Sequence, residues 1–173
     1  KGKNSILFLN SPNNPSGTVC KNLKEIAEVA KKHKIVILAD EIYSQLTFEG
    51  HYKSISNYYP EGTIVSSGLS KWCGAGGWRL GFFAIPNQLQ DLKNSLKILC
   101  SESFSSVSAP IQYAAIEAYT SDQSIYLKDV KKILSFVGNY VYENLNSNVI
   151  NIAKPEGGFY LFPEFTNTKF SSS

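Results

Sequence analysis

The sequence predicts an α/β fold: a mixed, mostly parallel sheet flanked by helices, followed by the start of a smaller α+β domain. Three observations lead to this fold class. Short apolar segments alternate with an amphipathic helical pattern early in the chain, which is typical of parallel strands joined by helices. A later apolar segment follows its predecessor too closely for a crossover helix, which favours an antiparallel strand pair within the sheet. Near residue 120 the order changes to helices followed by short strands, and we therefore expect two domains, 1–121 and 122–173.

The first three elements form a strand, a helix and a strand. Ser5–Asn10 is an apolar run stopped by the turn-rich segment Ser11–Gly17, which predicts a buried strand and a loop. A helix follows, which Asn22 can cap with Glu25 three residues later. Its apolar face is formed by residues at helical spacing: Leu23, Ile26, Ala27 and Ala30. Ile35–Ala39 is apolar at every position, as a strand covered on both faces would be, so a parallel pair is expected.

The later elements change the pattern. Thr63–Ser66 and Trp78–Ile85 read as strands, and the short loop between them favours an antiparallel pair. Three helical segments are then expected, at about 88–99, 109–119 and 124–145, the last with an apolar stripe. Two short strands, 149–152 and 159–162, complete the expected order.

Composition and charge narrow the function classes. Hydrophobic residues make up 43% and charged residues 18% of the 173 residues, as in a packed chain and unlike a disordered one. The densest basic cluster, Lys31–Lys34, ends a predicted helix, where cations stabilise the helix dipole, so we expect no nucleic-acid partner. No apolar run is long enough to span a membrane and no secretory signal begins the chain, so we expect a cytoplasmic protein without a membrane partner.

The cysteines bear on the redox compartment of the protein, and the missing methionine bears on where translation starts. Three widely spaced cysteines without a CxxC pair indicate neither a disulfide framework nor a metal site, and they fit a reducing compartment: Cys20, Cys73 and Cys100. Since the chain has no methionine, we expect residue 1 not to be a translation start, and a targeting segment could precede it.

Polar residues follow the predicted strands at the positions where α/β sheets bind ligands, beyond the carboxyl ends of the strands. They are Asn14, Asp40, Tyr43 and Lys71. Taken singly, Asn14 reads as a turn residue, Asp40 as a strand-end cap and Lys71 as a solvated lysine. Their occurrence together predicts a binding site. Arg79, the only arginine of the chain, lies close to them in sequence.

Four motifs carry a family resemblance. They are Asn14-Pro15-Ser16-Gly17, Ala39-Asp40-Glu41-Ile42-Tyr43, Ser66-Ser67-Gly68-Leu69-Ser70-Lys71 and Gly77-Trp78-Arg79-Leu80-Gly81. In this order and spacing they resemble the class I and II aminotransferases, fold-type I enzymes that use pyridoxal 5'-phosphate. Gln112–Ala115 and Pro155–Tyr160 are also similar to the family, so the resemblance covers nearly the whole chain. It implies that 1–121 is the C-terminal part of the large cofactor-binding domain and that 122–173 begins the small C-terminal domain.

The resemblance implies a role for each residue. Lys71 forms an imine (Schiff base) with the cofactor aldehyde and shuttles a proton during catalysis. Asp40 pairs with the protonated ring nitrogen, which keeps the ring electron-withdrawing. Asn14 and Tyr43 donate hydrogen bonds to the phenolic oxygen. Arg79 binds the phosphate, for which a planar bidentate donor is suited.

The resemblance extends less completely to the serines and the loop after the lysine. Ser70 and Ser67 are implied as further phosphate donors, although Gly68 stands where the family often has a hydroxyl residue. The segment 72–77 is richer in glycine than is usual in the family, which predicts local flexibility or a close approach of the backbone to the cofactor. Cys73, next to the lysine, is expected to be a packing residue.

The implied function is amino-group transfer between an amino acid and a 2-oxo acid by a homodimeric enzyme. Parts of the family's site have no counterpart here: the upstream phosphate loop, the aromatic ring that stacks on the cofactor, and a second arginine for the substrate carboxylate. We therefore expect these 173 residues alone not to transaminate. Substrate choice is not predicted, because the side-chain pocket in such enzymes lies largely outside this segment.

Two alternatives stay open at this stage. A lyase on the same scaffold would break a bond at Cβ or Cγ of the substrate; such relatives commonly carry histidine where this chain has Tyr43, which favours transfer. The chain could also be the non-catalytic effector domain of a transcriptional regulator, which would need a basic winged helix upstream.

Overall fold

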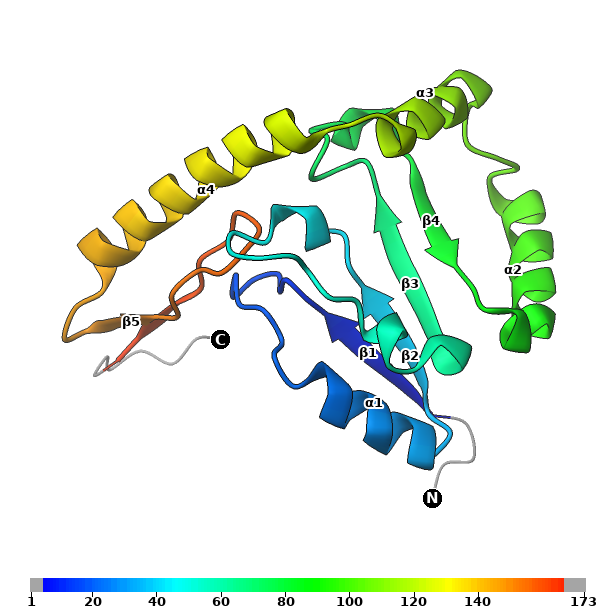
Figure 1. Cartoon of the computed structure of the whole chain (residues 1–173), viewed down its shortest axis with the longest axis horizontal. Coiled ribbons are helices and arrows are strands. Elements are labelled where there is room, and N and C mark those ends of the chain that lie inside the picture. Colours follow the sequence, from blue (N-terminus) through cyan, green and yellow to red (C-terminus); the bar gives the residue numbers. More distant parts are fainter. Residues whose placement is uncertain (1–4, 167–173) are drawn as a thin grey trace.

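The computed structural model describes residues 5–166, which form a four-stranded sheet, a separate two-stranded sheet and four α-helices (Figure 1). The strands are β1 (Ile6–Asn10), β2 (Val36–Asp40), β3 (Thr63–Gly68), β4 (Gly81–Ala84), β5 (Ile150–Ile152) and β6 (Pro163–Phe165). The helices are α1 (Leu23–Lys32), α2 (Gln90–Ser103), α3 (Ala109–Thr120) and α4 (Ser124–Leu145). Figure 1 shows α1 beside β1 and β2, α2 beside β4, and α4 running from the sheet toward β5.

The order and direction of the strands confirm the predicted mixed, mostly parallel sheet. The strands lie in the order β1-β2-β3-β4, with the first three parallel and β4 antiparallel to β3. In this register Asn10 lies opposite Asp40 and Gly68 lies opposite Gly81. The carboxyl ends of β1, β2 and β3 and the beginning of β4 therefore meet at one edge of the sheet, which is where the predicted site residues lie.

Helix α1 covers one face of the sheet with the apolar residues that the sequence indicated. The cluster between helix and sheet contains Leu23, Ala27 and Ala30 from α1 and Ile37 and Ala39 from β2. Burial of such side chains contributes about 25 cal/mol for each Å² of apolar surface removed from water. This cluster fixes β1 and β2 relative to each other and so positions the edge of the sheet.

The predicted side-chain cap of α1 is wrong. Asn22 precedes the helix but makes no capping hydrogen bond with its side chain. Its backbone angles, φ −94° and ψ 39°, differ from the extended conformation in which an N-cap side chain reaches the first turn.

The prediction that β1 is buried is wrong for one of its faces. Leu7 and Leu9 pack against the cluster under α1. Ile6 and Phe8, which point to the other face, are 70% and 63% exposed. Helix α1 covers only the first face, and no element among the described residues covers the second.

Strand β4 is shorter than the predicted Trp78–Ile85. Residues 76–78 form a 3-10 turn, and Arg79 has a left-handed backbone with φ 57°. Extended pairing with β3 therefore begins only at Gly81. The antiparallel direction of this pair is confirmed.

The last predicted strand, 159–162, is also wrong: β6 is Pro163–Phe165 and pairs antiparallel with β5. The aromatic residues of the predicted strand pack elsewhere. Gly157 pairs with Thr47 in an isolated bridge, and the rings of Phe159 and Tyr160 meet the Tyr43 ring edge-on. Tertiary contacts thus override the strand propensity of this segment.

The helices follow the predicted pattern. Helix α4 has the predicted bounds, and α2 continues to Ser103, past the predicted end. Part of the apolar stripe of α4 faces outward, since Ile133 is 61% and Val137 50% exposed. Within residues 5–166 no helix combines the length and the apolar character needed to cross a bilayer.

Candidate active site

A pocket of about 590 Å³ lies at the carboxyl ends of β1 and β2. Its lining residues are Phe8, Asn10, Asn13, Asn14, Asp40, Ile42, Tyr43 and Lys71. Four of the residues predicted from the sequence therefore meet in one pocket, although they come from three separate segments of the chain. The parallel register of the strands brings these segments together.

Asp40 is the last residue of β2, and main-chain and side-chain donors hold its carboxylate. Oδ1 accepts a hydrogen bond from the backbone N–H of Ile42 at 3.3 Å, and Oδ2 accepts one from Asn10 Nδ2 at 3.3 Å. These two hydrogen bonds fix the orientation of the carboxylate. Asp40 thus places a carboxylate of fixed orientation at the wall of the pocket.

The other member of the acidic pair, Glu41, is not among the residues that line this pocket. It is buried, and Ser54 Oγ donates a hydrogen bond to its carboxylate at 2.6 Å. Burial raises the pKa of Glu41, while the hydrogen bonds from Ser54 and Tyr52 act in the opposite direction. The structure therefore separates the two neighbours: Asp40 lines the pocket, and Glu41 anchors the loop at residues 52–55.

Asn14 lies in the loop after β1. Its backbone N–H donates to Asn10 Oδ1 at 2.7 Å, and the residue itself is exposed. The loop is held by Asn13, whose Oδ1 accepts from Ser16 and whose carbonyl oxygen accepts from the N–H of Gly17 at 2.8 Å. The turn chemistry of the sequence thus forms a fixed edge of the pocket.

Tyr43 is buried beside an aromatic pair from the C-terminal part of the chain. Its ring meets Phe159 and Tyr160 edge-on, with centroid separations of 5.4 and 5.6 Å. Its hydroxyl donates to Tyr160 Oη at 3.2 Å. Burial, followed by the contact with Tyr160, raises the pKa of Tyr43 well above its usual value, and the Asn14 side chain acts in the opposite direction. Tyr43 therefore keeps its proton at neutral pH and can act as a hydrogen-bond donor.

Lys71 follows the end of β3 by three residues and is half-buried. Its Nζ lies 5.8 Å from the centroid of the Tyr43 ring and 5.9 Å from that of the Phe159 ring. Among the described residues it forms no ion pair. The amine thus stands in the pocket against aromatic faces and is not bound to a carboxylate.

The three predicted phosphate donors lie at the same edge of the sheet but are not among the residues that line the pocket. Ser67 belongs to β3, and Ser70 follows that strand in the loop that carries Lys71. Arg79 is exposed, precedes β4, and donates from Nη1 to the carbonyl oxygen of Gly76 at 2.7 Å.

Gly68 marks a close approach of backbone to backbone at this edge. A Cβ at this position would lie 2.6 Å from the carbonyl oxygen of Leu80 and 2.9 Å from Gly81 Cα. These distances are shorter than Cβ contacts in proteins allow. A hydroxyl residue, which the family often has here, has no room beside β4.

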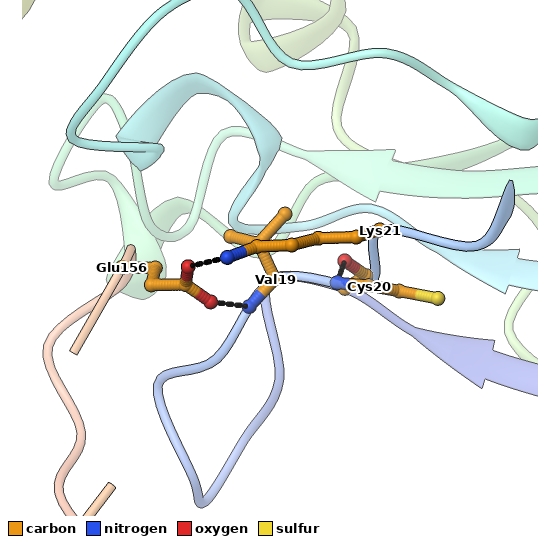
Figure 2. A network of polar contacts seen from close by, with 5 residues as sticks. Val19, Cys20, Lys21 and Glu156 are labelled. Atoms are coloured by element: carbon orange, nitrogen blue, oxygen red, sulfur yellow. Dashed lines mark hydrogen bonds and ion pairs between the residues drawn. The ribbon is translucent and has the colours of Figure 1, made fainter. Parts of the chain in front are cut away.

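A polar network ties the segment before Phe159 to the loop after β1 (Figure 2). The Glu156 carboxylate accepts from the backbone N–H of Val19 at 3.0 Å and pairs with Lys21 Nζ at 2.6 Å. The backbone N–H groups of Glu156 and Gly157 both donate to the carbonyl oxygen of Gly17. The Lys21 partner lowers the pKa of Glu156. These bonds hold the aromatic segment that packs against Tyr43.

Three contributors to the site were missed from the sequence. Asn10 holds Asp40, Tyr160 bonds Tyr43, and Phe159 lies against Lys71. The resemblance of Pro155–Tyr160 to the family was a signal for the two aromatic residues. The position of Asn10 at the end of an apolar strand was a signal for the first.

Comparisons with known proteins point to one family. The family model described as "Aminotransferase class I and II" matches residues 1–173. The putative aminotransferase YugH of Bacillus subtilis (strain 168) is 38% identical over 176 residues, covering 98% of this chain and 44% of the relative. The probable N-acetyl-LL-diaminopimelate aminotransferase of the same organism is 37% identical, with 93% of this chain and 40% of the relative covered.

Solved structures of aminotransferases are also similar to this chain. An alanine aminotransferase from Pyrococcus furiosus superposes with a TM-score of 0.86 at 34% identity, covering 96% of this chain and 44% of that one. The aspartate aminotransferase of Thermus thermophilus with maleate gives a TM-score of 0.83 at 28% identity, covering 92% and 42%. The chain therefore spans less than half the length of these relatives.

Proposed function

This chain belongs to the class I and II aminotransferases, and we propose that it carries the cofactor-holding part of an enzyme that moves an amino group between an amino acid and a 2-oxo acid. Pyridoxal 5'-phosphate is the proposed cofactor, attached to Lys71. One observation carries the proposal: Asn14, Asp40, Tyr43 and Lys71 line a single pocket at the carboxyl ends of two parallel strands.

The donor set of the pocket fits this cofactor group by group. The held carboxylate of Asp40 suits a protonated ring nitrogen. The Tyr43 hydroxyl, whose pKa burial raises further above neutral pH, and the Asn14 amide suit the phenolic oxygen. The Lys71 amine suits the aldehyde. When bound, pyridoxal phosphate supplies an electron sink for the negative charge that develops on the substrate Cα.

The residues of the chain then have separate tasks. Lys71 would hold the cofactor, and its Nζ would accept the proton that leaves the substrate Cα. Asp40 keeps the ring proton in place. Asn14 and Tyr43 would orient the ring by hydrogen bonds to its phenolic oxygen, with the Tyr43 O–H turning to it from Tyr160 Oη, and the Phe159 ring lies 5.9 Å from the amine.

Phosphate binding is assigned to Arg79, Ser67 and Ser70. All three lie at the edge of the sheet that carries Lys71, and the guanidinium of Arg79 uses Nη1 for Gly76 while its other N–H groups remain as donors. A guanidinium suits a phosphate because it offers two parallel hydrogen bonds.

The complete reaction needs more polypeptide than these residues. With the only arginine assigned to phosphate, none remains to bind the substrate carboxylate. We assign residues 1–121 to the large domain and 122–173 to the small domain of a longer homodimeric, cytoplasmic enzyme. The relatives named above differ in the amino acid they are named for, so the proposal is limited to amino-group transfer.

Cofactor addition to the purified protein tests the proposal. A visible absorbance band should appear, and borohydride reduction followed by peptide mass spectrometry should place the added mass on Lys71. Lys71→Ala should remove both signals. Attachment at another lysine would refute the assignment.

A second assay separates amino transfer from its alternatives in the cofactor-loaded complete enzyme. We expect glutamate to form from 2-oxoglutarate and an amino acid. Release of pyruvate or ammonia without amino transfer would instead indicate a lyase. Cofactor binding without either product would indicate a non-catalytic domain.

A further inference from the structure

We propose that Asn10 is a positioning residue of the cofactor site, which holds the Asp40 carboxylate and the Asn14 backbone in one fixed arrangement. This inference rests on the proposed function, because Asp40 and Asn14 matter only as residues that hold the cofactor. Asn10 belongs to none of the four motifs described above. Its role follows from its place in the sheet and from its hydrogen bonds.

Asn10 and Asp40 are register partners. Asn10 is the last residue of β1, Asp40 is the last residue of β2, and the two lie opposite each other in the parallel pair. Paired residues of neighbouring parallel strands point their side chains to the same face of a sheet. Both line the pocket with Asn14. The sheet itself therefore places the Asn10 amide beside the Asp40 carboxylate.

The Asn10 amide uses its full hydrogen-bonding capacity. Nδ2 donates to the carbonyl oxygen of Asp40 at 3.1 Å and to Asp40 Oδ2 at 3.3 Å. Oδ1 accepts from the backbone N–H of Asn14 at 2.7 Å and from Asn13 Nδ2 at 3.4 Å. The orientation of the amide is determined, since a backbone N–H can only donate and a carbonyl oxygen can only accept. Both N–H groups of Nδ2 and both lone pairs of Oδ1 therefore bond to Asp40 or to the loop after β1.

This arrangement fixes the carboxylate of Asp40 at both of its oxygens. Oδ1 is held by the backbone of Ile42 and Oδ2 by Asn10. Within residues 5–166, Asn10 is the side chain that donates to this carboxylate. A group held on both sides keeps its orientation without a ligand, and such preorganisation lowers the entropy that binding must remove.

The same amide connects the sheet to the loop. Asn14 is exposed, and its N–H is anchored to Asn10 Oδ1 by the shortest of the four bonds. One side chain therefore links the ring-nitrogen partner Asp40 to the phenolic-oxygen partner Asn14. Asn10 need not touch the cofactor to have this effect, which makes it a positioning residue and not a catalytic one.

Two variants test the inference in the purified protein. Asn10→Asp keeps the shape and can still accept from Asn14, but it cannot donate to Asp40 and it adds a like charge beside it. Asn10→Ala removes all four bonds. Asn22→Asp is the matched control, because it adds the same charge at an exposed residue whose side chain makes no capping bond.

Two readings are taken on each variant: the dissociation constant for pyridoxal phosphate and the pH at which the absorbance of the bound cofactor changes. Loss of a hydrogen bond to a charged group should weaken binding roughly tenfold or more in both Asn10 variants, with Asn10→Asp the weaker binder. The pH midpoint should move upward. A ring nitrogen that holds its proton less firmly makes the ring withdraw less electron density from the bond to Lys71. Asn22→Asp should match the unaltered protein in both readings.

The outcomes are distinguishable. Unchanged affinity and midpoint in the Asn10 variants would overturn the inference. Weaker binding with an unchanged pH midpoint would mean that Asn10 only stabilises the fold, and this result would also overturn the inference. If urea unfolding shows that Asn10→Asp does not fold, Asn10→Ala, which adds no charge, decides by the same readings. Absence of binding to the unaltered protein would refute the proposed function itself, and this inference with it.

Discussion

The change Tyr43→Phe removes one hydroxyl from the pocket and leaves the ring in place. Tyr43 is 3% exposed and meets Phe159 and Tyr160 edge-on, contacts that phenylalanine keeps. The hydroxyl donates to Tyr160 Oη at 3.2 Å. Because a neutral hydrogen bond contributes about 0.5–1.5 kcal/mol net, we expect the free energy of unfolding to fall by about 1 kcal/mol.

The matched variant Tyr160→Phe removes the same hydrogen bond from its other side. It should lower the free energy of unfolding by a similar amount, and the double variant should lose about as much as either single variant, because the two hydroxyls share one bond. Cofactor binding should distinguish them. Tyr43 lines the pocket and Tyr160 does not, so Tyr43→Phe should weaken pyridoxal phosphate binding roughly fivefold while Tyr160→Phe stays within about twofold of the unaltered protein.

Urea unfolding followed by circular dichroism measures the first effect, and absorbance titration with the cofactor measures the second. Equal weakening of cofactor binding in both variants would refute the donor role assigned to Tyr43, because the effect would then come from loss of the hydrogen bond that Tyr43 and Tyr160 share. A double variant that loses the sum of the two single losses would show that the two hydroxyls do not bond each other.

Two further predictions concern stability. Ile37 is fully buried under α1, so Ile37→Ala should lower the free energy of unfolding by about 2–5 kcal/mol in urea titrations; a loss under about 1 kcal/mol would show that this side chain is not in a packed core. Because the pKa of Glu156 is lowered in the folded protein, its contribution to the free energy of unfolding is present above its ordinary pKa. This contribution is lost as pH falls through the pKa of the folded state. Glu156→Gln should therefore be less stable than the unaltered protein at neutral pH, and the difference should shrink in acid unfolding series; a constant difference would exclude the ion pair with Lys21 as its cause.

Local patterns predicted the fold where a single element determines its own structure. Helix α4 has the predicted bounds because a long helical period is visible in the sequence alone. The exposed face of β1 was not predictable, because Phe8 is as apolar as a buried residue and only the position of α1 shows which face is covered. The segment 159–162 has strand-like residues, but contacts with Tyr43 decide its structure, and that partner is distant in sequence.

The pocket was predictable in part for a related reason. Asp40 ends a strand and Asn14 and Lys71 follow strands, and parallel strands bring such residues to one edge whatever the details of packing. Asp40 was predicted from the resemblance, and its neighbour Glu41 lies outside the pocket, where Ser54 engages it. Asn10 needed the register of β1 against β2, which the sequence does not specify to a single residue.

We expect the segment after residue 121 to take part in holding the proposed cofactor, because its aromatic residues pack against Tyr43 at the pocket. Phe159 and Tyr160 come from this segment, whereas Tyr43 and Lys71 come from the sheet side. Their contact depends on the bonds that join Glu156 and Gly157 to the loop at Gly17–Lys21 (Figure 2). The Asn14 turn belongs to the same loop after β1, so a shift of the C-terminal segment would move the aromatic residues that pack against Tyr43 and disturb this loop together. Binding of the cofactor and placement of the C-terminal segment are therefore expected to be coupled, because each stabilises the arrangement that the other requires.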